Sequence, residues 1–429
     1  MARKMKDSGI EWIGEIPEGW TKNKVIRLFD TIGSGTTPKN ITSDFPVVNW
    51  IQSGDITGSF MPACKNVISA NLLSQYSALK VYPAPFIIIA MYGASVGNAS
   101  ISLIDGCVNQ ACCVLSSPSC NLHYAFYVIK SAQSYLVRKA VGGGQPNISQ
   151  ETIKQLWLPL PPLSTQDIIV RNLDATCSKI DDLLSSVHAS IEEYKKFKQA
   201  VITQAVIKGV RGERERKDSG VDWIGKIPKE WVIQKIKSIS SRINVGVVIR
   251  PSEYFDENGT VPFLRGINVK EYLISSDNMV YINESSNRIL SKSQVHTDDI
   301  LIVRDGSIGT SCVVPAEFDG ANVVSMVIAT PSISCDSRFI CYSLNSDVGK
   351  TQFTLTKIGS ALTHTSVSAV SDIIVAVPSC AEQKEIADYL DAKCAEIDGL
   401  IAKKEQLIKE LESYKKSLIY EVVTGKREV

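Results

Sequence analysis

A segment of fifteen residues occurs twice, almost unchanged, in this chain of 429 residues. Residues Lys6 to Trp20 read KDSGIEWIGEIPEGW, and residues Lys217 to Trp231 read KDSGVDWIGKIPKEW. The second copy begins 211 residues after the first, which is too far apart for a solenoid, whose repeat is about 20–50 residues. The chain is therefore predicted to contain two copies of one unit, each a domain followed by a connector.

A second pair of similar segments marks the later part of each unit. Leu158 to Asp181 and Val375 to Asp398 align without a gap, at an offset of 217 residues. Because this offset exceeds the first by six, six residues have been added between the two anchors. We expect constant segments around two divergent inserts. The predicted segments are an N-terminal constant segment (1–20), a first insert (21–157), a central helical region (158–216), the repeat of the N-terminal segment (217–231), a second insert (232–374) and a C-terminal helical region (375–429).

The composition indicates a globular chain with more than one domain. Hydrophobic residues make up 44% and aromatic residues 7% of the chain, and the length exceeds what one core usually holds. The longest apolar run, Phe86 to Met91, is too short to cross a membrane. The charged start MARKMKDSG is not followed by an apolar stretch, so a secretory signal is not expected. We therefore expect a cytoplasmic protein.

Cysteine and histidine are not arranged as metal ligands. The eleven cysteines include no Cys-x-x-Cys pair, and the four histidines are scattered. Cys177 and Cys394 occupy equivalent places in the two copies, which favours packing over redox chemistry. We expect buried thiols and no metal site.

Two long helices are predicted, one after each insert. Apolar residues recur every three or four positions, the a and d spacing of a coiled coil, and Gly209 and Gly425 are placed where each helix should end. Two matching seams are most simply buried against each other, although each helix could instead be buried separately in its own domain. The predicted seam comprises Ile180, Leu183, Val187, Tyr194, Phe197 and Val201 in the first helix, and Ile397, Leu400, Leu407, Leu411, Tyr414 and Leu418 in the second.

The symmetry of a duplication predicts how these helices pair. Two equal units related by a pseudo-two-fold axis across the helices require an antiparallel coiled coil. The C-terminal stretch corresponds to the residues just before Lys217. We therefore expect residues 6–20 to pack near residues 414–425.

The two inserts have the pattern of α+β domains. Short apolar runs bounded by Gly, Pro, Asn and Ser predict strands, and two longer apolar stretches predict helices. Loose similarity between the inserts indicates one fold with different loops. The predicted strands are 45–51, 86–90, 261–264 and 299–303, and the predicted helices are 124–130 and 338–344.

Motifs of catalysis are few. The adjacent prolines Pro161 and Pro162 lack the flanking residues of an adenine-methylating site. Gly33 to Lys39 lacks the spacing of a phosphate-binding loop, and Gly93 to Gly97 is an isolated glycine pair. No nucleophile elbow of the form G-x-S-x-G is present. We expect a binding protein without catalytic or metal-binding residues of its own.

The order of these segments resembles the DNA-specificity subunit of type I restriction-modification enzymes, and the resemblance covers the whole chain. The loop Gly142 to Ser149 is also similar to a loop of that family, whereas Gly359 to Ser366 departs from it. The motifs that carry the resemblance are Asp7 to Trp20 and Asp218 to Trp231, Pro161 to Gln166 and Pro378 to Gln383, Tyr194 to Lys196 and Tyr414 to Lys416, and Val422 to Lys426.

The resemblance implies a function. The inserts would be two target-recognition domains, and the chain a non-catalytic subunit that selects a bipartite, asymmetric target in double-stranded DNA. Its partners would be two methyltransferase subunits and two restriction subunits. No cofactor is implied for this chain: S-adenosylmethionine would bind the methyltransferase, and ATP and Mg the restriction subunit.

Charge adds a condition to this hypothesis. The net charge of the whole chain is +1, far from the basic balance of an independent DNA-binding domain. Residues 21–157 hold ten basic and five acidic residues, a net +5, and residues 232–374 hold twelve basic and fourteen acidic residues, a net −2. We therefore expect the isolated chain to bind DNA weakly, with partner subunits supplying the phosphate contacts.

Base recognition requires Arg, Lys, Gln, Asn, Ser or Thr on loops that reach a groove. Arg265 and Arg304 are the strongest candidates, because each follows an apolar strand and precedes a turn containing glycine. A coiled-coil scaffold without DNA readout, or an enzyme with its site in an insert, are the alternatives. The candidates are Thr36, Thr37, Lys39, Gln52, Ser53, Ser95, Asn98, Gln145 and Asn147 in the first insert, and Arg250, Arg265, Asn268, Arg304, Ser307 and His364 in the second.

Overall fold

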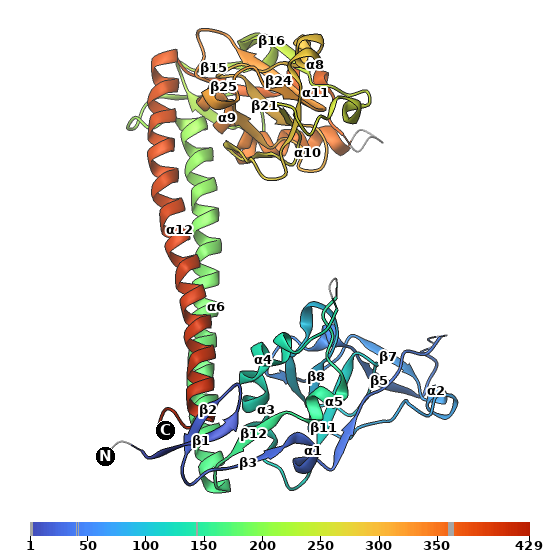
Figure 1. Cartoon of the computed structure of the whole chain (residues 1–429). Helices are drawn as coiled ribbons and strands as arrows, with labels where there is room; N and C mark the ends of the chain where they lie inside the picture. The colour runs from blue at the N-terminus through green and yellow to red at the C-terminus, as the bar shows by residue number, and fades with distance from the viewer. Residues whose placement is uncertain (1–2, 40, 42, 143–144, 359–363) are drawn as a thin grey trace. The chain divides into compact units, whose positions relative to one another are not determined.

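Two long helices and two inserts of mixed strands and helices make up the chain (Figure 1). The computed structural model describes residues 3–39, 41, 43–142, 145–358 and 364–429. The chain divides into two compact units: unit 1 comprises residues 1–187 and 406–429, and unit 2 comprises residues 188–405. Each unit therefore holds one insert, one copy of the fifteen-residue repeat and part of each long helix.

In unit 1, the apolar run Phe86–Ala90 forms the central strand β8, and all five of its residues are buried. Ile87 and Ile89 belong to one hydrophobic cluster and Ile88 to another, because alternate side chains of a strand point to opposite faces. The sheet order is β4-β11-β8-β9-β6, and a second sheet has the order β10-β5-β7. The strands are β1 (Met5–Ile10), β2 (Gly14–Pro17), β3 (Thr21–Lys24), β4 (Thr31–Gly33), β5 (Val47–Ile51), β6 (Phe60–Met61), β7 (Asn66–Ser69), β8 (Phe86–Ala90), β9 (Ala99–Ser102), β10 (Cys107–Val108), β11 (Cys112–Ser116) and β12 (Trp157–Leu160), and the shorter helices are α1 (Val25–Leu28), α2 (Asn71–Gln75), α3 (Leu122–Ser131), α4 (Gln133–Arg138) and α5 (Gln150–Lys154).

Unit 2 repeats this plan. Strand β21 is also fully buried, with Ile300 and Ile302 in one cluster and Leu301 in another. The sheets have the orders β16-β24-β21-β22 and β20-β17-β23. The strands are β13 (Arg216–Asp218), β14 (Lys226–Pro228), β15 (Val232–Lys235), β16 (Ser240–Val245), β17 (Val261–Leu264), β18 (Val269–Lys270), β19 (Leu273–Ile274), β20 (Val280–Ile282), β21 (Ile300–Val303), β22 (Ser311–Val313), β23 (Asn322–Val323), β24 (Met326–Pro331) and β25 (Ile374–Val377), and the shorter helices are α7 (Ile236–Ile239), α8 (Glu284–Ile289), α9 (Ser337–Asn345), α10 (Asp347–Ile358) and α11 (Val367–Ser371).

The two inserts share one topology. In unit 1, β5 pairs in parallel with β10 and antiparallel with β7; in unit 2, β17 pairs in parallel with β23 and antiparallel with β20. The strands before and after each insert also pair, as β3 with β12 and β15 with β25. The six predicted strands and helices of the inserts are all present, and the predicted α+β class is confirmed.

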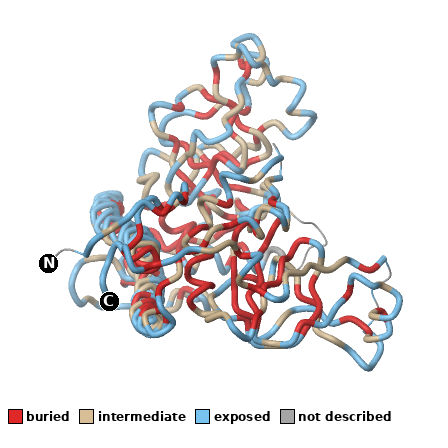
Figure 2. Tube along the Cα trace, turned by 60° about the horizontal axis from the view of Figure 1, so that its bottom comes forward, coloured by how far each residue is buried: buried red, intermediate tan, exposed pale blue. Residues whose placement is uncertain are grey.

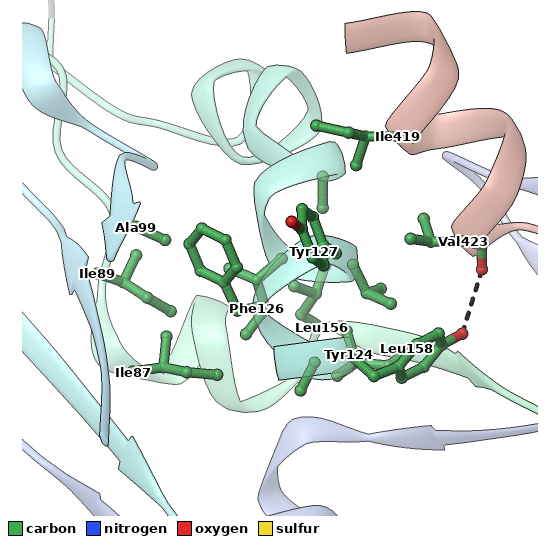
Figure 3. Packing of buried hydrophobic residues seen from close by; sticks show 14 of the residues in the cluster. Ile87, Ile89, Ala99, Tyr124, Phe126, Tyr127, Leu156, Leu158, Ile419 and Val423 are labelled. Carbon is green, nitrogen blue, oxygen red and sulfur yellow. Dashed lines mark hydrogen bonds between the residues drawn. The ribbon is translucent and has the colours of Figure 1, made fainter. Parts of the chain in front are cut away.

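Helix α3 links the insert of unit 1 to its constant segments. The Asn121 side chain caps the helix by accepting from the backbone N–H of Tyr124 at 3.0 Å. The buried Tyr124 hydroxyl is 3.0 Å from the carbonyl of Pro159 and 3.2 Å from that of Val423 (Figure 3). One phenol group therefore contacts both the strand that leaves the insert and the last turn of α12.

The two ends of the chain meet in unit 1, as expected. The Tyr420 hydroxyl lies 3.2 Å from the carbonyl oxygen of Ile13, and Lys426 donates to the same oxygen at 2.8 Å. The rings of Trp12 and Tyr420 are 6.4 Å apart. The prediction that residues 6–20 pack near 414–425 is confirmed.

The long helices α6 (Leu163–Lys208) and α12 (Cys380–Val423) end where the glycines predict. Gly209 and Gly425 have φ of 75° and 72°, a conformation that glycine adopts without steric cost. In unit 1, Lys415 of α12 pairs with Asp181 of α6 at 2.5 Å, and Tyr420, further along α12, belongs to the turn that packs on the start of the chain.

In unit 2, Lys198 of α6 pairs with Asp398 of α12 at 2.6 Å, and the Lys404 ammonium lies 5.5 Å from the centre of the Tyr194 ring. Moving from Lys198 back to Tyr194 thus moves forward along α12, so the helices are antiparallel. The helices pack on each other within each unit. The prediction that their seams bury each other is confirmed, and the alternative of separate burial is wrong.

The seam differs in part from the predicted one. Leu184 packs against the core of unit 1, and Ile191 of unit 2 is buried, so the seam passes through residues beside some of the predicted ones (Figure 2). Where two apolar residues are adjacent, as at Leu183 and Leu184, spacing alone does not decide which one faces the partner. Four predicted seam residues are exposed, and their assignment is wrong: Leu183 (53%), Phe197 (50%), Leu407 (41%) and Tyr414 (47%). The others, Ile180, Val187, Tyr194, Val201, Ile397, Leu400, Leu411 and Leu418, are buried or half-buried.

Candidate nucleic-acid interface

In unit 1, backbone hydrogen bonds hold the loop after β8 against the segment before α5. The N–H of Gly93 donates to the carbonyl of Pro146, and the N–H of Ile148 donates to that of Met91, both at 2.9 Å. Tyr92 and Asn147 form an isolated β-bridge. These contacts bring two groups of candidates into one place: Ser95 and Asn98 from the first loop, and Gln145 and Asn147 from the second.

The turn between β10 and β11 connects this pair of loops to two others. Its Asn109 N–H donates to the carbonyl of Ile51 at 3.1 Å, and its Ala111 carbonyl accepts from Met91 at 2.7 Å. The side chain of Gln110 accepts from the Thr37 hydroxyl at 2.6 Å. The loops that carry Thr36, Thr37, Lys39, Gln52 and Ser53 therefore gather around the same turn.

The corresponding loops of unit 2 are joined by equivalent bonds. Val324 donates to the carbonyl of Leu264 at 2.8 Å, as Asn109 does to Ile51. Thr365 donates to the carbonyl of Arg304 at 3.1 Å, as Ile148 does to Met91. The loop before α11 is thus placed as its counterpart is, although the departure noted at Gly359 to Thr363 lies outside the described residues.

These shared bonds align the candidates of the two units. The backbone N–H of Gln52 donates to Asp55 at 2.9 Å, and that of Arg265 donates to Asn268 at 3.0 Å, so Gln52 and Arg265 are equivalent. The amide of Asn268 also donates to the carbonyls of Ser275 and Asp277 at 3.1 and 2.9 Å, and its side chain is fully buried. Asn268 therefore holds the loop in shape, and its assignment as a base-reading residue is corrected.

Close backbone contact supports the first loop of each unit. Gly35 lies against the carbonyl of Val108 and Gly246 against that of Val323, and a Cβ atom at either position would overlap that oxygen. Glycine is required at both places for this reason. Lys39 and Arg250 follow these glycines by the same number of residues, so the two basic side chains occupy equivalent positions.

The arginines of unit 2 are held in different ways. The Arg265 guanidinium donates to the carbonyl of Asn278, and Arg304 Nε donates to that of Thr365 at 2.9 Å. Both side chains are half-buried, so their direction is constrained. Arg250 is exposed and pairs with Glu253 at 3.2 Å. Ser307 is exposed, and His364 is half-buried and forms a β-bridge with Asp305.

In unit 1 the candidates also differ in exposure. Lys39, Gln145 and Asn147 are exposed, while Thr36, Gln52, Ser53, Ser95 and Asn98 are half-buried. The Asn98 carbonyl oxygen accepts from Gln133 at 2.6 Å, and the Ser95 hydroxyl donates to the carbonyl of Tyr92 at 3.2 Å. Exposed side chains with donor and acceptor groups are the ones that can approach the edges of bases.

Three residues of these loops were missed by the sequence reasoning. Gln110 bonds to Thr37 at the central turn, Tyr92 is an exposed aromatic residue, and Asp305 accepts from the Ser325 hydroxyl at 3.3 Å. The position of Gln110 directly after a short buried strand, as for Gln52, could have indicated it. Asp305 introduces a negative charge beside Arg304.

The thiols have a packing role. Burial raises the pKa of Cys112, Cys113 and Cys312 to about 12, which keeps them protonated at neutral pH. In the part of the chain that the structure describes, no three His, Cys, Asp or Glu residues are grouped so that they could hold a metal ion, and no helix is long and apolar enough to cross a membrane.

Comparison with known proteins gives a consistent result. Residues 17–193 and 228–412 match the family model of the type I restriction modification DNA specificity domain. The type I restriction enzyme MjaVIII specificity subunit of Methanocaldococcus jannaschii is 26% identical over 71% of this chain and 69% of that protein. The putative MjaX specificity subunit of the same organism is 24% identical over 96% and 95%.

Solved structures show the same fold. A chain from work on complex assembly and conformational transition of the type I R-M system has a TM-score of 0.72 over 95% of this chain and 98% of that one, at 14% identity. The HsdS subunit of Thermoanaerobacter tengcongensis has a TM-score of 0.51 over 96% and 98%, at 15% identity. With both of its units matched by the family model, this chain belongs to the type I restriction modification DNA specificity domain family.

Proposed function

We propose that the chain recognises a bipartite, asymmetric target in double-stranded DNA, each unit reading one half. The observation that carries this proposal is the repeated set of loop hydrogen bonds, which presents different side chains at equivalent positions. Lys39 and Gln52 in unit 1 correspond to Arg250 and Arg265 in unit 2. Because Gln pairs best with adenine and Arg with guanine, two equivalent surfaces with different residues favour two different half-sites.

The chain would act as the non-catalytic subunit of a larger complex. Its proposed partners are two methyltransferase subunits, which bind S-adenosylmethionine, and two restriction subunits, which use ATP and Mg. The insert of unit 2 has a net charge of −2, so phosphate contacts from these partners would supply most of the nonspecific affinity. The loops of the two units would then select the sequence.

Methylome sequencing tests this function directly. Cells that express the chain with its methyltransferase subunits should carry methylated adenines in one motif with two different halves and a spacer of fixed length. Cells that express the methyltransferase alone are the control and should lack the motif. Unchanged methylation in the presence of the chain would exclude DNA readout and favour a coiled-coil scaffold.

A further inference from the structure

A buried carboxylate links three constant segments in unit 2. Glu382, in the first turn of α12, is 2% exposed. It accepts from the Trp231 indole N–H at 3.2 Å and from the Arg214 guanidinium. The same guanidinium lies 5.4 Å from the centre of the Trp231 ring and pairs with Glu230 at 3.1 Å. Arginine and indole therefore surround one carboxylate, and a second carboxylate completes the arginine's contacts.

Unit 1 has the same arginine and tryptophan without either acid. Arg3 and Trp20 stand 211 residues before Arg214 and Trp231, and the Arg3 guanidinium is likewise 5.4 Å from the centre of the Trp20 ring. The residue at the place of Glu230 is Gly19, and the residue at the place of Glu382 is Thr165, at the offset of 217 that holds for the long helices. The duplication has thus kept the donors and lost both acceptors.

The donors of unit 1 are left unsatisfied. The indole nitrogen of Trp20 is buried and has no hydrogen-bond partner among the described residues, and within the same residues Arg3 forms no ion pair. A buried donor without an acceptor is unfavourable. The two side chains line a cavity of 370 Å³ together with Lys4 and Thr165. Glu18 also lines this cavity, but its counterpart, Lys229, is not part of the unit 2 network.

We propose that this cavity of unit 1 binds one carboxylate side chain of the methyltransferase subunit, which takes the place that Glu382 has in unit 2. A carboxylate matches the two kinds of donor, because guanidinium and indole N–H groups can bond to its two oxygens. The cavity lies where the fifteen-residue repeat meets the start of α6, outside the loops proposed to read bases. This inference rests on the proposed function for the identity of the partner, and on the comparison of the two units for the chemistry.

Indole ¹⁵N–¹H resonances of the full-length chain report on the site. Loss of one signal in Trp20→Phe and of another in Trp231→Phe assigns the two indoles. Acetate, the carboxylate probe, should shift the Trp20 signal and leave the Trp231 signal in place, since Glu382 already occupies that site. Thr165→Glu should shift the Trp20 signal without acetate and remove its response, whereas Thr165→Ser should respond like the natural chain. A Trp20 signal that acetate does not move would overturn the proposal.

The purified methyltransferase subunit tests the source of the carboxylate. It should shift the Trp20 signal in the natural chain, and Thr165→Glu should weaken its binding to unit 1 at least tenfold while Thr165→Ser has no effect. Equal binding to both variants, or a shift of the Trp20 signal by a DNA duplex without the methyltransferase, would refute a methyltransferase carboxylate. The methylated motif should keep its sequence in Thr165→Glu. Failure to find any motif in the natural chain would instead refute the proposed DNA readout, and leaves the acetate result unchanged.

Discussion

Lys198 pairs with Asp398 across the helices of unit 2, and 217 residues along the chain from each, the same two residue types pair in unit 1 as Lys415 with Asp181. The lysine is on α6 in one unit and on α12 in the other. A single ancestral contact thus occurs twice with the helices exchanged, which is the pattern that a pseudo-two-fold duplication produces.

These ion pairs should set the register of the helices and add little to stability. Both aspartates are 55% exposed, so each pair should contribute about 0.2–1 kcal/mol. We expect Lys415→Glu to lower the midpoint of urea unfolding slightly, and Lys415→Glu combined with Asp181→Lys to recover it. Failure of the double variant to recover would argue against a direct interaction between the two charges.

The corrected seam predicts opposite results for two neighbouring leucines. Leu184 packs against the core of unit 1 and Leu183 is exposed. Leu184→Ala should destabilise the protein by about 1–3 kcal/mol, because it removes packed methyl groups from a partly buried site. Leu183→Ala should change stability by less than about 0.5 kcal/mol. Thermal unfolding of both variants measures the difference, and equal losses would contradict the seam described above.

The glycines beneath the first loop of each unit should not tolerate a side chain. Gly35→Ala would place a methyl group on the carbonyl of Val108, and Gly246→Ala would do the same at Val323. Each should destabilise its unit by about 1–3 kcal/mol through displacement of the loop. Gly54→Ala is the matched control, because a Cβ atom there would meet no neighbour within 4 Å. Calorimetry of the three variants tests this, and similar melting temperatures would count against the close contact.

Arg265 and Asn268 lie in one loop but should give different phenotypes. Arg265→Ala should relax the recognised bases in one half-site by about 1–3 kcal/mol of discrimination while leaving the fold intact. Asn268→Ala should instead lower stability by about 1–3 kcal/mol, since it leaves buried carbonyls without their donor. Methylome sequencing and thermal unfolding separate the two effects. Arg288→Ala, an exposed change on α8, should alter neither.

The buried thiols should resist alkylation until the protein unfolds. A pKa of about 12 for Cys112, Cys113 and Cys312 keeps the thiolate fraction very small at pH 8, and thiolate is the reactive form. Iodoacetamide at that pH should modify the exposed Cys380 and spare these three, and denaturant should make all four reactive. Mass spectrometry of the native protein showing modified Cys112 would indicate that its surroundings open readily.

Local pattern was enough to predict the elements, because helix period, apolar runs and terminal glycines are properties of neighbouring residues. The ends of α6 and α12 at Gly209 and Gly425 are examples. The errors arose where a distant contact decides the outcome. Asn268 is buried because a later turn offers the carbonyls of Ser275 and Asp277 to its amide. Gln110 matters because Thr37, far away in the sequence, reaches it, and no local signal contains either fact.

The matching loop bonds of the two units also bear on how such a chain could diversify. The bonds of Ile51 and Leu264, and of Met91 and Arg304, involve main-chain atoms, so the side chains beside them can mutate without loss of the fold. A substitution at Gln52 or Arg265 would then redirect every activity that depends on the chain at once, and protection of the host genome would change together with attack on foreign DNA. New target preferences could therefore arise in one mutational step, without a lineage passing through a self-destructive intermediate.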